Sequence, residues 1–74
     1  MEELKFVVTC NYRIKGIITN CETREQAFNK FLLCRGIDKS NVKNILDNKY
    51  EPFYRTFEYE GEFYTLDGFY FDIL

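Results

Sequence analysis

One stretch of this 74-residue chain, from Thr23 to Ile37, carries a complete helix pattern. Thr23 can cap the first turn, and Gln26 three residues later completes a capping box. Gly36 is a typical left-handed helix stop, and Ile37 can make the apolar contact that follows such a stop. Between these ends a stripe at helical spacing predicts the buried face, formed by Ala27, Phe28, Phe31, Leu32 and Cys34. The rest of the core must therefore come largely from strands under this helix.

Residues 5–14 alternate between apolar and polar positions, which predicts a half-buried strand. Its inward face is formed by Phe6, Val8, Cys10, Tyr12 and Ile14. Lys15-Gly16 can form a two-residue hairpin turn, and Cys10 then faces Cys21. The residues buried by the returning strand are Ile17, Thr19 and Cys21. A slip of one residue would bury polar side chains instead, so the apolar pattern selects this register.

The segment SNVKNILDN, residues 40–48, predicts a short second helix or, alternatively, a loop with one helical turn. The apolar side of that helix is Val42, Ile45 and Leu46. Three strands follow, in the sequences FYRTFEY, EFYTL and FYFDIL. Glu60-Gly61 predicts the hairpin turn before the second of these strands, and Asp67-Gly68 predicts the turn before the third.

These two turns sort the last three strands into two faces. The face predicted to pack under the helix collects Arg55, Phe57, Tyr59, Glu62, Tyr64, Leu66, Phe69, Phe71 and Ile73. The opposite face collects Tyr54, Thr56, Glu58, Phe63, Thr65, Tyr70 and Asp72. The second face is either covered by the protein itself, through the second helix or the first hairpin, or available to a partner.

Together these elements predict an α+β fold. It is a two-layer sandwich in ββα(α)βββ order, with a mostly antiparallel five-stranded sheet and one main helix packed on one face. Residues 1–74 form a single domain, because the chain is near the lower size for one core and contains no repeat or long linker. Eight Phe and six Tyr supply the apolar area that so small a core needs.

Catalysis and metal binding have little support in this composition. The chain has no His, which removes the commonest general base and metal ligand at neutral pH. Glu58 and Asp72 share a predicted face at about 9–10 Å, near the separation of an inverting glycosidase pair, but solvated surface charge explains them better. Cys10, Cys21 and Cys34 could hold a metal, but small buried thiols explain them better. We expect no catalytic residue, no metal site, no cofactor and no enzymatic activity.

The sequence favours a cytoplasmic protein with free thiols and no membrane contact. Its first residues carry acids where a secretory signal carries bases, and no run approaches the ~20 apolar residues of a membrane span. An odd number of widely spaced Cys argues against a disulfide framework. Phe, Asn, Lys, Ile and Tyr, all with AT-rich codons, make up 32 of 74 residues. This favours an AT-rich bacterial or phage genome and, for a phage protein, the host cytoplasm.

Charge is divided unevenly along the chain. Residues 1–46 hold eight Lys/Arg and five Asp/Glu, a net charge of +3. Residues 47–74 hold two Lys/Arg and seven Asp/Glu, a net charge of −5, so the whole chain carries −2. An acidic, aromatic C-terminal part repels phosphates, so we expect no direct nucleic-acid binding. It would attract a partner protein with a basic surface.

Two functional hypotheses follow. The first is a small non-enzymatic protein-binding module, a phage-type inhibitor of a host or defence protein in the style of an anti-CRISPR or a nucleic-acid mimic. Its binding residues form an acidic and aromatic sheet face made of Tyr54, Glu58, Glu60, Phe63, Tyr70 and Asp72. The second is a self-associating structural or accessory module, a homodimer formed through strand edges or through the aromatic face.

Overall fold

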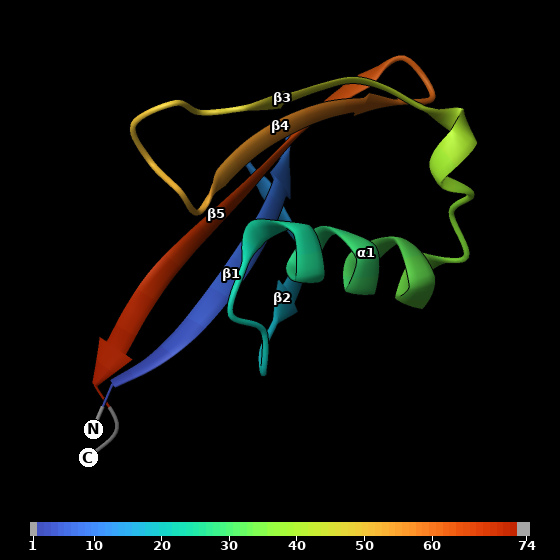
Figure 1. Ribbon diagram of the computed structural model, residues 1–74. Coiled ribbons are helices and arrows are strands. Elements are labelled where there is room, and N and C mark those ends of the chain that lie inside the picture. The colour runs from blue at the N-terminus through green and yellow to red at the C-terminus, as the bar shows by residue number, and fades with distance from the viewer. Residues whose placement is uncertain (1, 73–74) are drawn as a thin grey trace.

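The computed structural model describes residues 2–72, with every side chain among them except that of Asp72. Its elements are β1 (Glu2–Cys10), β2 (Arg13–Ile18), α1 (Arg24–Arg35), the 3₁₀ turn η1 (Lys39–Asn41), β3 (Val42–Asp47), β4 (Tyr54–Tyr59) and β5 (Glu62–Asp72). The strands form one five-stranded sheet in the order β2-β1-β5-β4-β3, with every neighbouring pair antiparallel. Helix α1 lies across one face of this sheet (Figure 1). The predicted α+β class and two-layer arrangement are confirmed.

The helix begins and ends where its local sequence predicts. Thr23 Oγ1 accepts a hydrogen bond from the Gln26 amide at 3.1 Å, and Gln26 Oε1 accepts one from the Glu22 amide at 2.8 Å. Gly36 is left-handed at φ 66°, and the Ile37 amide reaches back to the Leu32 carbonyl at 2.9 Å. This closes the helix with a Schellman motif.

The core forms between α1 and the sheet. Four of the five predicted helix residues are buried, namely Ala27, Phe28, Phe31 and Leu32. The Phe57 ring lies 5.0 Å from Phe28 and 6.2 Å from Phe31, between ring centres. From the sheet, Phe6, Val8 and Leu66 join this core, which also includes Ile18, Cys21 and Val42. The prediction for Cys34 was wrong, because it lies on the exposed side of the helix.

The first hairpin turns four residues earlier than predicted. Asn11 and Tyr12 both have positive φ, 53° and 63°, as a type I′ turn requires. Lys15-Gly16 therefore lies within β2, where a Cβ on Gly16 would stand 3.3 Å from the Phe31 ring. The bare glycine lets the helix approach the sheet, which explains why it is not used for the turn.

This shift changes which side chains are inside. Phe6, Val8 and Cys10 are buried as predicted, but Tyr12 is fully exposed and Ile14 is mostly exposed. Cys10 pairs with Arg13 rather than with Cys21. Ile18, and not Ile17, is the buried residue of β2.

The predicted second helix is a strand. Only the single 3₁₀ turn η1 precedes it, capped by the Asp38 carboxylate, which accepts the Ser40 amide at 3.0 Å. Val42–Asp47 then pairs with β4 as the outer strand, with an irregularity at Asn44, whose φ is 53°. Pairing along the open edge of β4 satisfies backbone groups that a two-turn isolated helix could not satisfy as well.

The predicted Asp67-Gly68 turn is also wrong, because β5 runs without interruption from Glu62 to Asp72. The Gly68 amide instead donates to the Phe53 carbonyl at 3.1 Å. The Glu60-Gly61 turn is confirmed, with φ values of 52° and 78°. Because β5 is continuous, alternation places Phe69 and Phe71 on the face away from the helix and Tyr70 on the helix side, the reverse of the prediction. Ile73, also predicted for the core face, lies outside the described residues.

Candidate protein-binding surface

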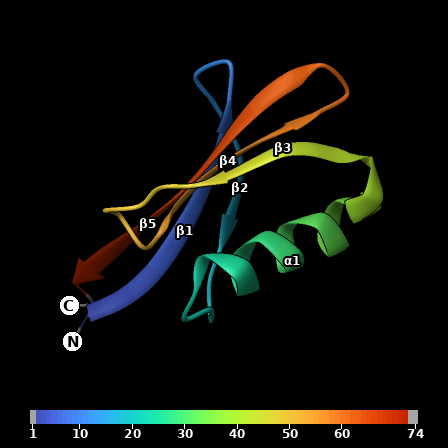
Figure 2. The same ribbon diagram turned by 45° about the horizontal axis from the view of Figure 1, so that its top comes forward.

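The sheet face that points away from α1 is called here the open face. In the two ribbon views, no described segment crosses it (Figures 1 and 2). Its large apolar residues are Val7, Ile14, Ile17, Leu46, Tyr54, Phe63, Phe69 and Phe71, placed there by strand register. Six of them are 44–68% exposed, with Phe63 at the upper limit and Phe71 at the lower. Val7 and Tyr54 are half-buried by their neighbours.

Two isoleucines reach this face through an irregularity in β2. Thr9 pairs with Ile14 and Val7 with Ile17, and the register shifts between Val8 and Thr9. Between these two pairs β1 advances by two residues and β2 by three, so β2 has a bulge with Lys15 as the extra residue. As a result, Ile14 and Ile17 both face outward, although three positions apart they would normally alternate.

The centre of the open face is polar and its charge is nearly balanced. Thr9, Thr65 and Thr56 form a row across β1, β5 and β4. The charged residues on this face are Glu3, Lys5, Lys43, Glu58 and Asp67, three acids and two bases, placed by the same register. Their net charge is −1, so the open face is more apolar and less acidic than predicted.

Glu58 and Asp67, two acids of this face, have different surroundings. Glu58 pairs across the strands with Lys43, and its Oε1 accepts a hydrogen bond from Asn44 Nδ2 at 2.7 Å. The pKa of Asp67 is raised, first by burial and then by the Glu51 carboxylate, although the Gly68 amide opposes this. The protonated form of Asp67 is therefore easier to reach than that of a fully solvated Asp.

A hollow of about 310 Å³ opens beside Phe63. Its lining comes from the β1–β2 turn and from β5, and consists of Thr9, Cys10, Asn11, Tyr12, Phe63 and Thr65. Phe63 and Tyr12 are strongly exposed at its rim. A side chain of a partner protein could enter this hollow, as anchors do at interfaces.

The six predicted binding residues are only partly brought together. Tyr54, Glu58 and Phe63 lie on the open face, and Glu60 lies exposed in the adjoining β4–β5 turn. Tyr70 does not join them, because the continuous strand turns it toward the helix side, where its ring packs 5.8 Å from that of Phe53.

Asp72 ends β5 opposite Glu2, and its side chain lies outside the described part. Glu58 pairs instead with Phe63, nine positions earlier on β5. The strand rise of about 3.3 Å per residue puts roughly 30 Å between Glu58 and Asp72. Glu58 and Asp72 therefore do not form the carboxylate pair of a glycosidase.

Sequence reasoning missed five apolar residues of the open face. They are Ile14, Ile17, Leu46, Phe69 and Phe71. The sequence shows that Phe69 and Phe71 lie on one face of the strand and Tyr70 on the other. Which of these faces packs under the helix depends on whether Asp67-Gly68 forms a turn. A strand that continues straight through Asp67-Gly68 would place Phe63, Phe69 and Phe71 together on one face, and this pattern is the signal that could have identified them.

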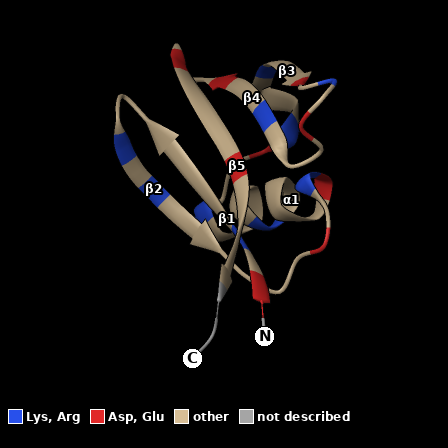
Figure 3. Ribbon diagram, turned by 90° about the vertical axis from the view of Figure 1, so that its left-hand side faces the viewer, with Lys and Arg blue, Asp and Glu red and all other residues tan. Residues whose placement is uncertain are grey.

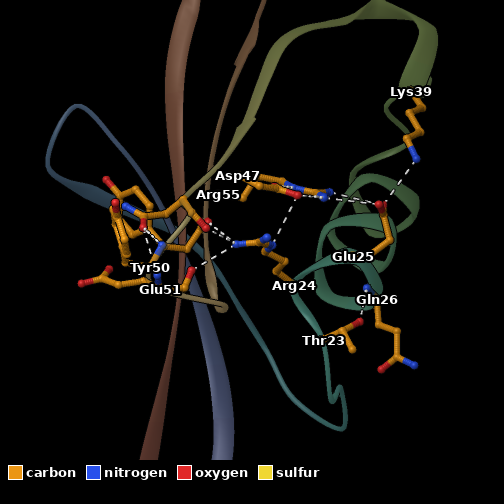
Figure 4. Close-up of polar contacts among 11 residues, drawn as sticks. Thr23, Arg24, Glu25, Gln26, Lys39, Asp47, Tyr50, Glu51 and Arg55 are labelled. Carbon is orange, nitrogen blue, oxygen red and sulfur yellow. Dashed lines mark hydrogen bonds and ion pairs between the residues drawn. The ribbon is translucent and has the colours of Figure 1, made fainter.

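A cluster of ion pairs and hydrogen bonds lies at the start of α1 (Figure 4). Arg55 is 5% exposed and pairs with both Asp47 and Glu25, while Arg24 pairs with Asp47 at 3.3 Å. Hydrogen bonds from Arg55, followed by its charge, lower the pKa values of Glu25 and Asp47 against the opposing effect of burial. The Asp47 and Glu25 hydrogen bonds in turn raise the pKa of Arg55.

Arg24 extends this cluster to the β3–β4 loop. Its Nη1 donates to the carbonyls of Asn48, Glu51 and Tyr54 at 2.9, 3.1 and 3.2 Å. The cluster thus ties the helix, β3, β4 and their loop together. Each charged group has its partner within the cluster, so its contacts are those of a scaffold that holds the sheet.

The three thiols are free and differ in their exposure. Cys10 and Cys21 are buried, and Cys34 is exposed. The Cys10 thiol donates to Glu62 Oε2 at 3.4 Å, and burial, with help from that carboxylate, raises its pKa. A raised pKa makes Cys10 a poor nucleophile at neutral pH. Within residues 2–72, no three His, Cys, Asp or Glu side chains gather as a metal-binding group.

Comparisons with known proteins do not extend this description. No protein-family model matches the chain, and neither a curated protein nor a solved structure does. No α-helix between residues 2 and 72 has the length and apolar character needed to cross a membrane.

Proposed function

We propose that this chain is a small non-enzymatic protein-binding module that meets its partner through the open face. One observation carries the proposal: six large apolar side chains, 44–68% exposed, share one uncovered face of the sheet. Antiparallel sheets that face water normally carry polar residues on that side. Clustered exposed apolar residues instead mark interaction sites.

A protein fits this face better than a nucleic acid does. The aromatic residues are surrounded by three acids and two bases, so phosphates gain little from it. Aromatic anchors with a polar rim are the usual composition of a protein interface. Phe63, beside its hollow, is the residue we expect to contribute most.

The finer proposal concerns the charge of the partner. Glu58, Glu60 and Glu62 flank Phe63 at the end of the sheet formed by β4 and β5. This end favours a basic surface on the partner, which it would attract over the Debye length. A host or defence protein whose basic groove receives nucleic acid is such a partner, and the module would then act as a phage-type inhibitor.

A site-specific photo-crosslinker tests the proposal. It is placed at Phe63 on the open face and, as the matched control, at Leu33, which is 82% exposed on the outer side of α1. In a lysate of the source cells, the Phe63 position should crosslink one dominant protein that the Leu33 position does not. Excess unlabelled chain should abolish that crosslink, and excess Phe63→Ala chain should not.

The purified crosslinked protein then gives the quantitative test. Phe63→Ala should weaken its binding by about tenfold to a hundredfold, as loss of an aromatic anchor does. Charge reversal at Glu58 or Glu60 should mainly slow association, and less so at high salt. Equal crosslinking from both positions, or none from either, would contradict the proposal. Loss of the partner's own activity on binding would support the inhibitor.

A further inference from the structure

The ends of β1 and β5 form a two-stranded arm that leaves the rest of the sheet. β2 pairs with β1 only from Phe6 onward, and β4 pairs with β5 only as far as Asp67. Glu2–Lys5 and Phe69–Asp72 therefore pair with each other and with no other described strand. Figures 1 and 2 both show these ends running together beyond the helix and β4. An isolated pair of strands is marginally stable in water.

The backbone of Tyr70 faces the open side of this arm. The Gly68 amide points away from β1, since it donates to the Phe53 carbonyl at 3.1 Å. Phe6 and Gly68 are thus a non-hydrogen-bonded pair of the β1–β5 ladder. Such pairs alternate, so Leu4 and Tyr70 are the next one. The Tyr70 N–H and C=O accordingly point to the side where β4 has ended.

This edge lacks the protection that the outer edges of the sheet carry. β2 has a bulge and two basic residues, Arg13 and Lys15, and Figure 3 shows basic positions along it. β3 has its own irregularity at Asn44, with Lys43 beside it. The sequence from 68 to 71 contains no charge and no Pro, and its ladder with β1 has no register shift. A flat apolar edge without such devices is a site of strand pairing.

We propose that two copies of this chain pair antiparallel through this edge of β5, with Tyr70 of one opposite the partner's Tyr70. The two Tyr70 backbones would then exchange N–H···O=C bonds in both directions. Phe-Tyr-Phe is symmetric about Tyr70, so Phe69 meets the partner's Phe71 on the open face, twice. One surface serves both copies, as a two-fold interface requires.

Two further observations favour a second copy as the occupant. Residues 69–71 would face residues 71–69 of the partner and carry no charge, so identical copies meet without like-charge repulsion there, whereas two β2 edges would oppose basic residues. A hollow of about 290 Å³ also lies where β4 leaves β5, and its lining includes Pro52, Phe53 and Phe69 together with the acids Glu51 and Asp67. The partner's Phe71, opposite Phe69, would lie beside this hollow.

The available area sets the strength of this dimer. Phe69, Tyr70 and Phe71 are 47%, 58% and 44% exposed. Covering these rings in both copies removes at most roughly 450–750 Å², since an aromatic side chain presents 150–250 Å². Stable interfaces bury more than this, so we expect a concentration-dependent dimer with a dissociation constant in the micromolar range or weaker.

Sedimentation velocity over a concentration series tests the pairing with a matched pair of variants. Phe71→Lys places a charge beside the free edge, and Phe63→Lys places the same charge on the same face of the same strand where β4 already pairs. The unmodified chain should shift from monomer to dimer. Phe71→Lys should raise the dissociation constant about tenfold or more, and Phe63→Lys should leave it nearly unchanged.

Amide hydrogen exchange of the unmodified chain supplies the second measurement. Protection of the Tyr70 amide should rise with protein concentration, while that of paired β4 amides should not change. A chain that stays monomeric throughout, or a Tyr70 amide indifferent to concentration, overturns the proposal. Dimerisation abolished by Phe63→Lys but not by Phe71→Lys would place the interface on the open face instead. Crosslinking of a partner at Phe63 is independent of all these outcomes.

Discussion

Gly68 and Phe53 touch backbone to backbone at the point where β4 leaves β5. The Gly68 amide donates to the Phe53 carbonyl, and a Cβ built on Gly68 would stand 2.7 Å from Phe53 Cβ and 2.8 Å from Phe6 Cε2. Phe53 in turn packs edge-on to Phe6, with 5.7 Å between ring centres. The glycine therefore permits a close approach in a straight strand and does not make a turn.

Gly68→Ala should accordingly destabilise the fold. The added methyl group has no room, so Phe53 and β5 must move apart, at a cost of about 1–3 kcal/mol. Urea unfolding followed by circular dichroism measures this change. Thr65→Ala, on the same strand but on the open face, is the control and should change the stability much less. Equal stability of Gly68→Ala and the unmodified chain would refute the close contact.

Phe31 is the second test of the core. It is 3% exposed, lies between Phe57 and Tyr64, and covers Gly16. Phe31→Ala should lower the free energy of unfolding by about 3–5 kcal/mol, much of the stability of so small a domain. Leu33→Ala, on the exposed side of the same helix, should cost less than about 0.5 kcal/mol. Thermal melts that coincide for the two variants would show that α1 packs through another face.

Arg55 links stability to pH. Its guanidinium lies 4.8 Å from the centre of the Phe28 ring and pairs with Glu25 and Asp47, whose pKa values are lowered. Groups with a lowered folded pKa stabilise the fold above their ordinary pKa. That contribution is lost as the pH falls through the folded value. Stability should therefore decline as the pH falls below about 4.5, the ordinary value for Glu25.

Removal of Arg55 tests this linkage. Arg55→Met should cost about 1–3 kcal/mol at neutral pH, less than a fully buried pair would, because both carboxylates are partly exposed. Its stability should also depend less on pH in the acidic range, since Glu25 and Asp47 lose the cation that lowers their pKa. Denaturant titrations at several pH values measure both effects. A variant with an unchanged acid profile would show that other carboxylates control acid unfolding.

The β1–β2 turn offers a stabilising change. Tyr12 is fully exposed and has φ 63°, a left-handed conformation that costs a side-chain-bearing residue roughly 1–2 kcal/mol. Tyr12→Gly creates the Asn-Gly sequence preferred in this turn and should raise stability by about 0.5–1 kcal/mol. Tyr50→Gly, at an exposed position without positive φ, should bring no such gain. A lower melting temperature for Tyr12→Gly would argue against the Asn11-Tyr12 turn.

The helix and much of the apolar alternation of the strands follow from local sequence alone. Thr23, Gln26, Gly36 and Ile37 act through atoms a few residues apart, so their hydrogen bonds form wherever the helix lies. The inward positions of Phe6, Val8 and Phe57 also follow from local alternation. The confirmed Glu60-Gly61 turn is likewise local, because both residues accept positive φ.

Contacts between distant parts of the chain, in contrast, fixed the roles of Gly16, Gly68 and residues 42–47. Gly16 and Gly68 look like turn residues in sequence, but Phe31 and Phe53 need the space that their missing side chains leave. Residues 42–47 became a strand because the edge of β4 was there to pair with. These contacts set the register of β2 and β5. The register decides which face of the sheet each side chain of a strand occupies. Contacts between residues distant in sequence therefore placed Ile17, Phe69 and Phe71 on the open face.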